Sequence, residues 1–563
     1  MIPSSSKAYQ ARFPLLVLIA LLIALHGLLL ARPDAQLVHL VPDDACFYPR
    51  IAQNVLLGHG VTFDGLGVTT GFHPAWFLAL TGVLKAVALV FPNVLHDGHL
   101  LFRISLLATC AVNLLLGLVT YGLLRRATAS RWAFLCMALA LSMAVRLMGY
   151  GLMMETHLLI LFLGVLLWAA GHYATAAPPR RLRTGLALWA AGALVPLARI
   201  DFSIVAFLVA FLTFAFRGPG TGRTAARNAA GWIAGGAAAG IALNMAFNFA
   251  VTGDLFSTSA YLKNYGPPLD MLDQLAINLR RARAWTGRLD GAAALVLAGS
   301  AGWIFRNKDA PARSGVLRLA FFCAAAFALL FLHLLKNNLP APWYYWPFRY
   351  FLFLGAAAGL LALADRFAAG RPGPRWASGL GHLAALLLVL HAVQSLRAGL
   401  RDLPMDRGHA AVYGFSQDVA ERVPEDGLVL CEDFSGFLSL FSQRRIVNGD
   451  GLVNSPEFIS GYLTQGKVWN YLQARRIGYY VVSRMDTAEF RRKRTEPVFL
   501  DAVKPFFLDV PPSVIPLDNR NLLAHRTGAR RDRTFALFKL DFDVAVPLET
   551  DPGAAAAVPT AID

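Results

Sequence analysis

Charged residues are scarce in this sequence. Of its 563 residues only 15% are Asp, Glu, Lys or Arg, while 56% are hydrophobic. A water-soluble chain of this length could not hide so much apolar surface. The apolar residues also cluster, in runs such as 15–30, 101–124 and 231–251. Each run is near the ~20 residues that span a bilayer, so the sequence predicts a polytopic α-helical membrane protein.

Cysteine is also scarce, with 5 residues scattered along the chain. An odd number without regular spacing argues against a disulfide framework or a metal cluster. Cys46 and Cys431 fall on the same side of the membrane in the topology described below. A bridge between these two therefore stays open.

Nucleotide and zinc motifs are missing. The sequence has no GxGxxG before a helix, no P-loop, no HExxH and no zinc-ligand spacing, which excludes the usual nucleotide-binding enzymes. The formal net charge is +17, but the arginines lie mostly in short turns between apolar runs. Such a distribution is typical of membrane topology and argues against nucleic-acid binding.

The basic turns predict the topology. If Lys7 and Arg12 lie inside, every strongly basic short loop stays inside when about eleven segments cross the membrane. Segment 74–91 is apolar, but counting it as a crossing would invert all later loops, so we expect it to lie in the outer interface. The expected spans are 14–32, 101–124, 132–147, 154–174, 184–198, 202–217, 229–251, 290–306, 315–336, 347–365 and 378–397.

The character of the chain changes near residue 403, where the sequence becomes mixed, charged and rich in turn residues. We expect residues 1–402 to form a membrane domain whose first outer loop, 33–100, carries interfacial helices. Residues 403–563 are expected to form a small α/β domain on the outer side, with a disordered tail. Its expected strands are 427–431, 445–447 and 478–483, and its expected helices are 411–422 and 456–474.

Two adjacent carboxylates, Asp43 and Asp44, follow the first membrane exit, with Tyr48 close behind. Partial desolvation at a membrane surface raises the pKa of a carboxyl group, which makes it a better proton acceptor near neutral pH. The alternative is that an aspartate caps the helix that follows it. That alternative explains one aspartate more easily than two.

Other polar residues lie at the outer ends of the expected spans. His73 is a candidate for contacting a phosphate or a hydroxyl, or is an interfacial histidine beside an aromatic anchor. Placing Glu155 at the start of an apolar helix costs free energy unless the residue is paired or functional. Alternatively, its negative charge could interact favourably with the helix dipole. Arg199 and Asp201 flank an outer turn and either bind substrate or pair with each other.

Basic residues also occur on the outer side, where the positive-inside rule does not expect them. Such a cluster suits an anionic lipid headgroup, and an arginine can hold a phosphate as a bidentate fork. The alternatives are ordinary headgroup anchoring and an aromatic belt. The residues are Lys263, Arg280, Lys336 and Arg349, with Tyr344 and Tyr345 between the last two.

Taken together, these segments resemble the GT-C superfamily of integral-membrane glycosyltransferases, which use polyprenyl-phosphate-linked sugars. Asp43-Asp44 followed by an aromatic pair and Arg50 resembles the acidic motif of that family. Segments 71–76 and 151–156 resemble two later motifs of bacterial members. The resemblance extends to 429–433, 445–455 and 479–482, which are similar to the outer domain of such enzymes.

Bacterial mannosyl, arabinofuranosyl and aminoarabinose transferases belong to this superfamily. The lipid A and protein-mannosyl members commonly carry Asp-Glu where this chain has Asp-Asp, so the sugar and the acceptor stay open. The resemblance implies a monomer in the bacterial inner membrane, with its active site and C-terminal domain facing the periplasm. Its partners would be the lipid-linked donor, membrane lipids and a glycan, lipid or protein acceptor.

The implied reaction is an inverting transfer with an aspartate as general base. Asp43 would deprotonate the acceptor hydroxyl, and Asp44 or Glu155 would orient the acceptor or the base. No cofactor is expected, and a divalent cation is not required but stays open. Competing interpretations are a polyprenyl-lipid transporter or flippase, an O-antigen-type ligase of the envelope and a non-enzymatic scaffold. The implied phosphate-binding residues are Lys263, Arg280, Lys336, Arg349 and His73, and the implied acceptor-binding residues are Tyr48, Arg199, Asp201, Tyr344 and Tyr345.

Overall fold

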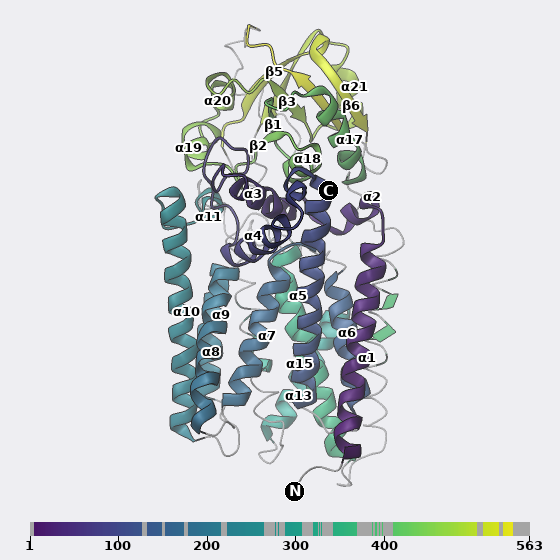
Figure 1. Cartoon of the computed structure of the whole chain (residues 1–563), viewed down its shortest axis with the longest axis vertical. Helices are drawn as coiled ribbons and strands as arrows, with labels where there is room; N and C mark the ends of the chain where they lie inside the picture. Colours follow the sequence, from purple (N-terminus) through teal and green to yellow (C-terminus); the bar gives the residue numbers. More distant parts are fainter. Residues whose placement is uncertain are drawn as a thin grey trace.

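A bundle of long helices and a region containing a β-sheet make up the two ends of the molecule in a computed structural model of the chain (Figure 1). We call the part from His409 onward the C-terminal region, and the end of the bundle nearest to it the sheet-side end. The structure describes residues 5–126, 132–148, 152–173, 178–215, 222–263, 288–306, 319–324, 342–368, 409–503, 510–527 and 533–543, with isolated residues between 276 and 397.

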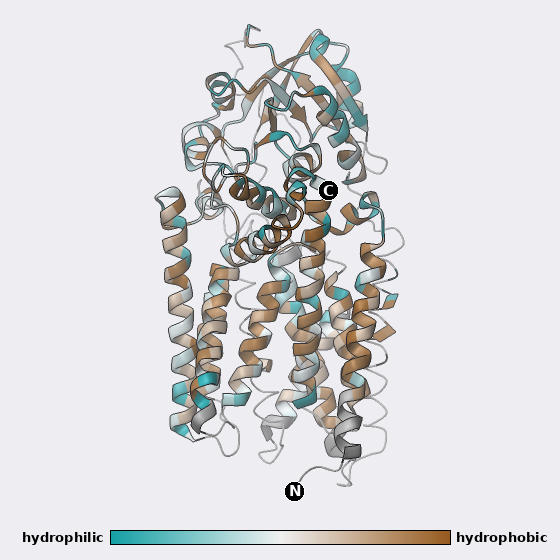
Figure 2. Ribbon diagram, in the orientation of Figure 1, coloured by the Kyte–Doolittle hydropathy of each residue, from teal (hydrophilic) through white to brown (hydrophobic). Residues whose placement is uncertain are grey.

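The bundle confirms a multi-pass membrane protein. Of the described helices, 5 are long and apolar enough to cross a membrane, and Figure 2 shows hydrophobic residues along the length of the bundle. Each bundle helix covers one expected span, whereas spans 315–336 and 378–397 lie largely outside the described residues. The helices are α1 (Ser5–Leu30), α5 (Gly98–Arg126), α6 (Ala133–Met148), α7 (Thr156–Tyr173), α8 (Pro178–Ala198), α9 (Ser203–Ala215), α10 (Arg223–Thr252), α13 (Arg288–Arg306) and α15 (Pro342–Ala368).

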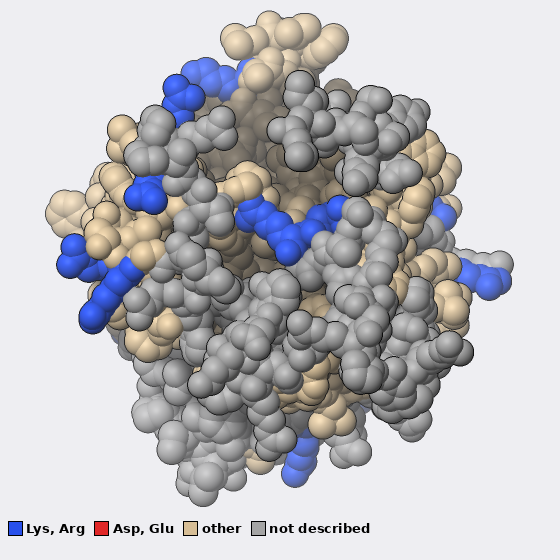
Figure 3. All heavy atoms as spheres, turned by 90° about the horizontal axis from the view of Figure 1, so that it is seen from below, with Lys and Arg blue, Asp and Glu red and all other residues tan. Residues whose placement is uncertain are grey.

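Basic residues gather at the end of the bundle that points away from the C-terminal region. Seen from that end, the described surface shows Lys and Arg and no Asp or Glu (Figure 3). Arg125 and Arg126 close α5, Arg181 and Arg183 lie in the first turns of α8, and Arg223 begins α10. The charge pattern expected from the sequence thus occurs at one end of the described bundle.

Between the bundle and the C-terminal region lies the segment 33–97, which we call the first loop (Figure 1). Its helix α4 is short and does not extend the bundle, which agrees with the expected interfacial placement of 74–91. The exposed apolar side chains of Leu78, Val83 and Phe91 fit that placement. Its elements are α2 (Asp34–Leu37), η1 (Val38–Leu40), η2 (Asp43–Cys46), α3 (Phe47–Leu56), α4 (Pro74–Ala88) and η3 (Pro92–His96).

The C-terminal region contains a sheet of order β2-β1-β3-β7-β6. Its first three strands are parallel, and β7 and β6 are antiparallel additions. The strands expected near 428, 445 and 479 are confirmed as β1 (Leu428–Cys431), β2 (Arg445–Asn448) and β3 (Tyr479–Val482). The other elements are α17 (His409–Arg422), α18 (Ser435–Ser442), α19 (Pro456–Phe458), the π-helical η6 (Ile459–Leu463), α20 (Val468–Ala474), α21 (Thr487–Lys493), β4 (Val498–Val503), β5 (Ser513–Asp518), η7 (Asn519–Asn521), β6 (Leu522–Thr527) and β7 (Thr534–Lys539).

The first strand in sequence, β1, lies between the next two: β2 pairs with one side of β1 and β3 with the other. The side on which strands are added therefore reverses between β2 and β3, and the loops after the parallel strands meet at one edge of the sheet. In open α/β sheets, the crevice at such a reversal is the usual place for a ligand. Helix α18 starts at this edge, directly after β1.

Glycines let the first loop and the start of α5 touch the C-terminal region backbone to backbone. A Cβ atom on Gly71 would overlap the carbonyl oxygen of Leu452, and one on Gly98 would overlap that of Leu440. Only a residue without a side chain permits such close approach. Side-chain bonds add to the contact: Arg445 Nε donates to Asp64 O at 3.0 Å, and Arg50 Nη2 donates to Arg444 O at 3.1 Å.

Candidate active site

The acidic pair lies where the first loop meets the C-terminal region. Both carboxylate oxygens of Asp43 accept backbone hydrogen bonds from the first turn of α18. The N–H of Phe437 donates to Oδ1 at 2.6 Å, and the N–H of Gly436 donates to Oδ2 at 3.1 Å. These N–H groups have no partner within the helix, so a carboxylate suits them. Asp43 thus caps α18 rather than the helix that follows Asp43 in sequence, which was the alternative the sequence left open.

The surroundings of Asp43 act on its pKa in opposite directions. Desolvation raises the pKa well above its usual range, and the negative charges of Asp44 and Asp433 raise it further. The hydrogen bonds from Phe437 and Gly436 lower it, because they stabilise the charged form. The net effect is upward, so the carboxylate of Asp43 is a stronger base than an ordinary aspartate.

Three acidic residues follow β1 and β2 at the edge of the sheet that faces this pair. Glu432 pairs with Arg484 (Oε1 to Nη1, 2.6 Å), and Asp433 pairs with Arg533 (Oδ2 to Nη1, 3.2 Å). Burial raises the pKa of Asp450 to about 7, and the charges of Asp44 and Asp433 contribute. The mutual influence of these groups shows that the acidic pair and the sheet edge form one charged region.

A second polar cluster centres on Glu155, which is fully buried just before α7. Tyr48 Oη donates to its Oε2 at 2.8 Å. Its Oε1 lies 3.6 Å from His73 Nε2 and 3.4 Å from Arg199 Nη1. In the sequence, each of these residues stands out separately as a candidate. The structure brings them together around one carboxylate, although they are far apart in sequence.

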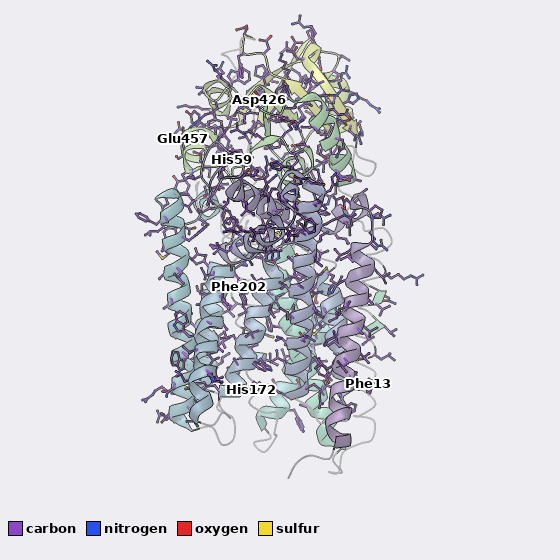
Figure 4. The ribbon with its side chains drawn as sticks, in the orientation of Figure 1. Phe13, His59, His172, Phe202, Asp426 and Glu457 are labelled. Atoms are coloured by element: carbon purple, nitrogen blue, oxygen red, sulfur yellow. The ribbon has the colours of Figure 1, made fainter. Side chains whose placement is uncertain are left out.

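Arg199 joins this cluster to the turn between α8 and α9. Its Nη2 and Nε contact the carboxylate of Asp201 at 2.8 and 3.2 Å, which confirms the pairing considered from the sequence. Its guanidinium lies 4.0 Å from the ring centre of Tyr344. The ring of Phe202, labelled in Figure 4 in the sheet-side part of the bundle, lies 5.6 Å from the same guanidinium. Arg199 is thus buried among carboxylates and aromatic rings.

Local backbone geometry presents Glu155. Met153, two residues earlier, has φ 65°, a left-handed conformation that is unusual for a side chain of this kind. The carbonyl of Met153 accepts a bond from Trp76 Nε1 at 2.6 Å, which ties segment 152–155 to the start of α4. The motif-like segments 71–76 and 151–156 are therefore in direct contact.

The two clusters adjoin along one helix. Asp44 lies in η2 and Tyr48 in α3, and the backbone between them stays helical through Cys46 and Phe47. Residues four apart on a helix lie on the same face. The acidic pair and the Glu155 cluster are therefore neighbours along one continuous helical stretch. The side chain of His73 in the second cluster is partly exposed.

The candidate phosphate-binding residues do not all lie at one place in the structure. Arg349 on α15 forms a buried ion pair with Asp290 on α13 (Nε to Oδ1, 2.6 Å), and Tyr345 Oη donates to the same carboxylate at 3.4 Å. Arg280 is exposed. Lys336 and the side chain of Lys263 lie outside the described residues. The structure thus brings His73 to the Glu155 cluster and places Arg349 in a separate pair.

Sequence reasoning did not single out Glu432, Asp433, Asp450, Arg484 or Gly436. The available signal was their position shortly after expected strands, where ligand-binding side chains collect when the strands are parallel. Cys46 and Cys431 are free, buried thiols, so the bridge left open by the sequence is not formed. Within the described ranges, no group of three or more His, Cys, Asp or Glu residues is arranged to hold a metal ion.

Comparison with known proteins finds similarity at the level of structure. No family model and no curated protein matches the chain. The crystal structure of ArnT from Cupriavidus metallidurans bound to undecaprenyl phosphate matches with a TM-score of 0.50 and 13% identity, over 94% of this chain and 99% of that one. The apo oligosaccharyltransferase of Archaeoglobus fulgidus matches with a TM-score of 0.50 and 12% identity, over 87% and 76% of the two chains. The chain therefore has the GT-C-type fold of these membrane glycosyltransferases.

Proposed function

We propose that this protein is a glycosyltransferase that moves a sugar from a polyprenyl-phosphate carrier to an acceptor hydroxyl, with inversion at the anomeric carbon. The observation that carries the proposal is the oriented carboxylate of Asp43 at the sheet-side end of a membrane bundle. The bundle has the fold of a protein that was solved with undecaprenyl phosphate bound. A lipid-linked donor in the bilayer would reach this end of the bundle directly.

In the proposed reaction, Asp43 accepts the proton of the acceptor hydroxyl. The freed oxygen attacks the anomeric carbon from the face opposite the phosphate. The bond between that carbon and the phosphate oxygen breaks, and its electron pair leaves with the polyprenyl phosphate. The raised pKa of Asp43 supports this role, because a general base works best when its pKa approaches the working pH.

Negative charge develops on the departing phosphate, and cationic groups that are already in place stabilise it most effectively. We propose His73 as the described residue nearest to this role, since its partly exposed ring adjoins the buried Glu155. Arg349, Lys263, Arg280 and Lys336 stay proposals for the same function. Tyr48, Arg199, Asp201, Tyr344 and Tyr345 are proposed to shape the acceptor pocket, and Asp44 and Glu155 to orient the acceptor.

We propose that the protein resides in the bacterial inner membrane as a monomer, with about eleven crossings. Residues 403–563 would form a periplasmic domain beside the active site. The basic residues at the far end of the bundle support this orientation, because positive charge favours the cytoplasmic side. The sugar, whether mannose, arabinofuranose or aminoarabinose, and the glycan, lipid or protein acceptor remain for experiment to identify.

The test is transfer by the purified protein from a panel of synthetic polyprenyl-phosphate sugars. Asp43→Asn is expected to lower the transfer rate by ~10²–10⁴, the usual contribution of a general base. Asp97→Asn is the matched control. Asp97 also caps a helix, accepting bonds from His99 N and Leu100 N at 2.8 and 3.1 Å, but it lies at the start of α5.

The same assay separates the competing functions. A transporter or flippase would move the carrier lipid across a vesicle membrane without breaking the bond between sugar and phosphate. A ligase would transfer a glycan with a histidine as its key residue, so His73→Ala would abolish activity while Asp43→Asn would not. Full transfer activity in Asp43→Asn would overturn the proposed mechanism.

A further inference from the structure

The contact between Asp43 and α18 is unusually close. A Cβ atom on Gly436 would overlap the carbonyl oxygen of Asp43 and lie 3.0 Å from its Oδ1. The absence of a side chain at this position lets the backbone of η2 rest on the first turn of α18. The N–H groups of Gly436 and Phe437 then reach both carboxylate oxygens.

Helix α18 is held in this position from several sides. Asn448 at the end of β2 donates to Ser435 Oγ at 2.8 Å, which ties the first residue of α18 to the sheet. Leu440 lies against Gly98 at the start of α5, where a Cβ atom would overlap its carbonyl oxygen. The helix is therefore clamped between the sheet and the bundle, and its N-terminal N–H groups have a defined direction.

We propose that α18 is the positioning element of the catalytic base, and that Gly436 is the positioning residue that admits the carboxylate of Asp43 to the helix N-terminus. The inference rests on the proposed function, because it assigns Asp43 as the base. It goes beyond that function by making the C-terminal region a working part of the active site. In this view the region does more than cover the site or bind the acceptor.

The arrangement has a measurable consequence for proton transfer. The two N–H bonds stabilise charged Asp43, while desolvation, Asp44 and Asp433 oppose the charge. Among the described residues, the thiols of Cys46 and Cys431 also face it. Losing the N–H bonds raises the pKa of Asp43, so the base stays protonated to a higher pH. The acid limb of the pH–rate profile, where activity rises as Asp43 loses its proton, should then move to higher pH.

The experiment compares the pH dependence of transfer in the full-length wild type, Gly436→Ala and Gly98→Ala. Gly436→Ala pushes η2 away from α18 directly. Gly98→Ala displaces α18 from the side of α5, without touching Asp43. Gly461→Ala is the matched control, since a Cβ atom there meets nothing within 4 Å.

The proposal expects the acid limb to move up by about one pH unit or more in both Gly436→Ala and Gly98→Ala, because a hydrogen bond to a charged group is worth about that much. The KM for the donor should change less than kcat. Gly461→Ala should match the wild type. A variant that merely folds poorly would lose the same fraction of activity at every pH, and that result in both variants would overturn the positioning role.

A readout without turnover gives a second check. The protonation of Asp43 can be followed by infrared titration of its carboxyl band, assigned by its loss in Asp43→Asn. An unchanged midpoint in Gly436→Ala would overturn the positioning role even if activity fell. If the wild type transfers sugar but the acid limb of the pH–rate profile of Gly436→Ala lies at the same pH, this inference is overturned and the proposed function stays intact. A wild type inactive with every donor would overturn both.

Discussion

The hydroxyl of Tyr48 donates a 2.8 Å hydrogen bond to Oε2 of Glu155, although 107 positions separate the two residues. The bond joins α3, which follows the acidic pair directly, to the residue just before membrane helix α7. His73 and Arg199 approach the other oxygen of the same carboxylate. Glu155 is therefore the buried charge around which the first loop is organised on the bundle.

Tyr48→Phe is expected to destabilise the protein by about 1.5–3 kcal/mol, because it removes a buried hydrogen bond to a charged group. Glu155 keeps Arg199 as a partner, so the fold should survive. The melting temperature in detergent measures the effect. Tyr462→Phe, at a partly exposed ring of the C-terminal region, is the control, and an equal loss in both variants would contradict the special role of Tyr48.

Asp450 predicts a pH-dependent stability. Burial raises the pKa of Asp450 from 3.8 to about 7 in the folded protein. Its contribution to stability is therefore greatest below pH 4 and is lost as the pH rises through about 7. Asp450→Asn removes the buried charge while its amide oxygen can still accept the 2.8 Å bond from Leu452 N.

The Asp450→Asn variant should be more stable than the wild type above pH 7, by roughly 4 kcal/mol at most, from three pH units at about 1.4 kcal/mol each. The two should converge as the pH falls toward 4. Thermal unfolding of both proteins across this range measures the difference. A constant difference at all pH values would show that Asp450 does not titrate in this window.

Because Asp290 and Arg349 form an ion pair, we expect substitutions of the two residues to have non-additive effects on stability. Removing one partner of a buried pair leaves an uncompensated charge, at a cost of about 3–5 kcal/mol. Asp290→Ala and Arg349→Ala should each lower the melting temperature, and the double variant should lose less than the sum. If the losses simply add, the pair does not hold α13 against α15. A rise in the donor KM in Arg349→Ala alone would add a phosphate-binding role.

Gly71→Ala should separate the first loop from the C-terminal region, because its Cβ atom would overlap the carbonyl oxygen of Leu452. We expect faster proteolysis of the first loop and loss of most transfer activity. Gly82→Ala in α4 is the matched control, since nothing lies within 4 Å of a Cβ atom there. Alanine favours helices over glycine by ~1 kcal/mol, so the control should be neutral or slightly stabilising. Limited proteolysis distinguishes the two variants.

Much of the architecture could be predicted from local patterns. Apolar runs indicated the described bundle helices, and the basic turns indicated that segment 74–91 does not join them. Short apolar runs indicated three strands, and the structure shows that they pair in parallel. These features depend on residues close together in sequence, and hydropathy and charge report on such neighbours directly.

The contacts of the candidate site could not be predicted in the same way. Tyr48, His73 and Glu155 were each recognised as costly or conspicuous, but their meeting depends on how helices pack across a hundred residues. For Asp43 the sequence left open a cap on the helix that follows it, whereas the carboxylate caps α18, which begins almost four hundred positions later. Asp450 was noted only as part of segment 445–455, because its charged neighbours at the sheet edge come from other segments of the chain.

The bond between Asp43 and α18 also orders events during synthesis. The first loop leaves the ribosome early, while its partner helix is translated 393 positions later. Until then the acidic pair has no helix N-terminus to hold it and no sheet edge beside it. A nascent or truncated chain would already occupy the membrane, yet it would lack a completed reaction centre. The reaction centre is therefore completed only after α18 has been synthesised.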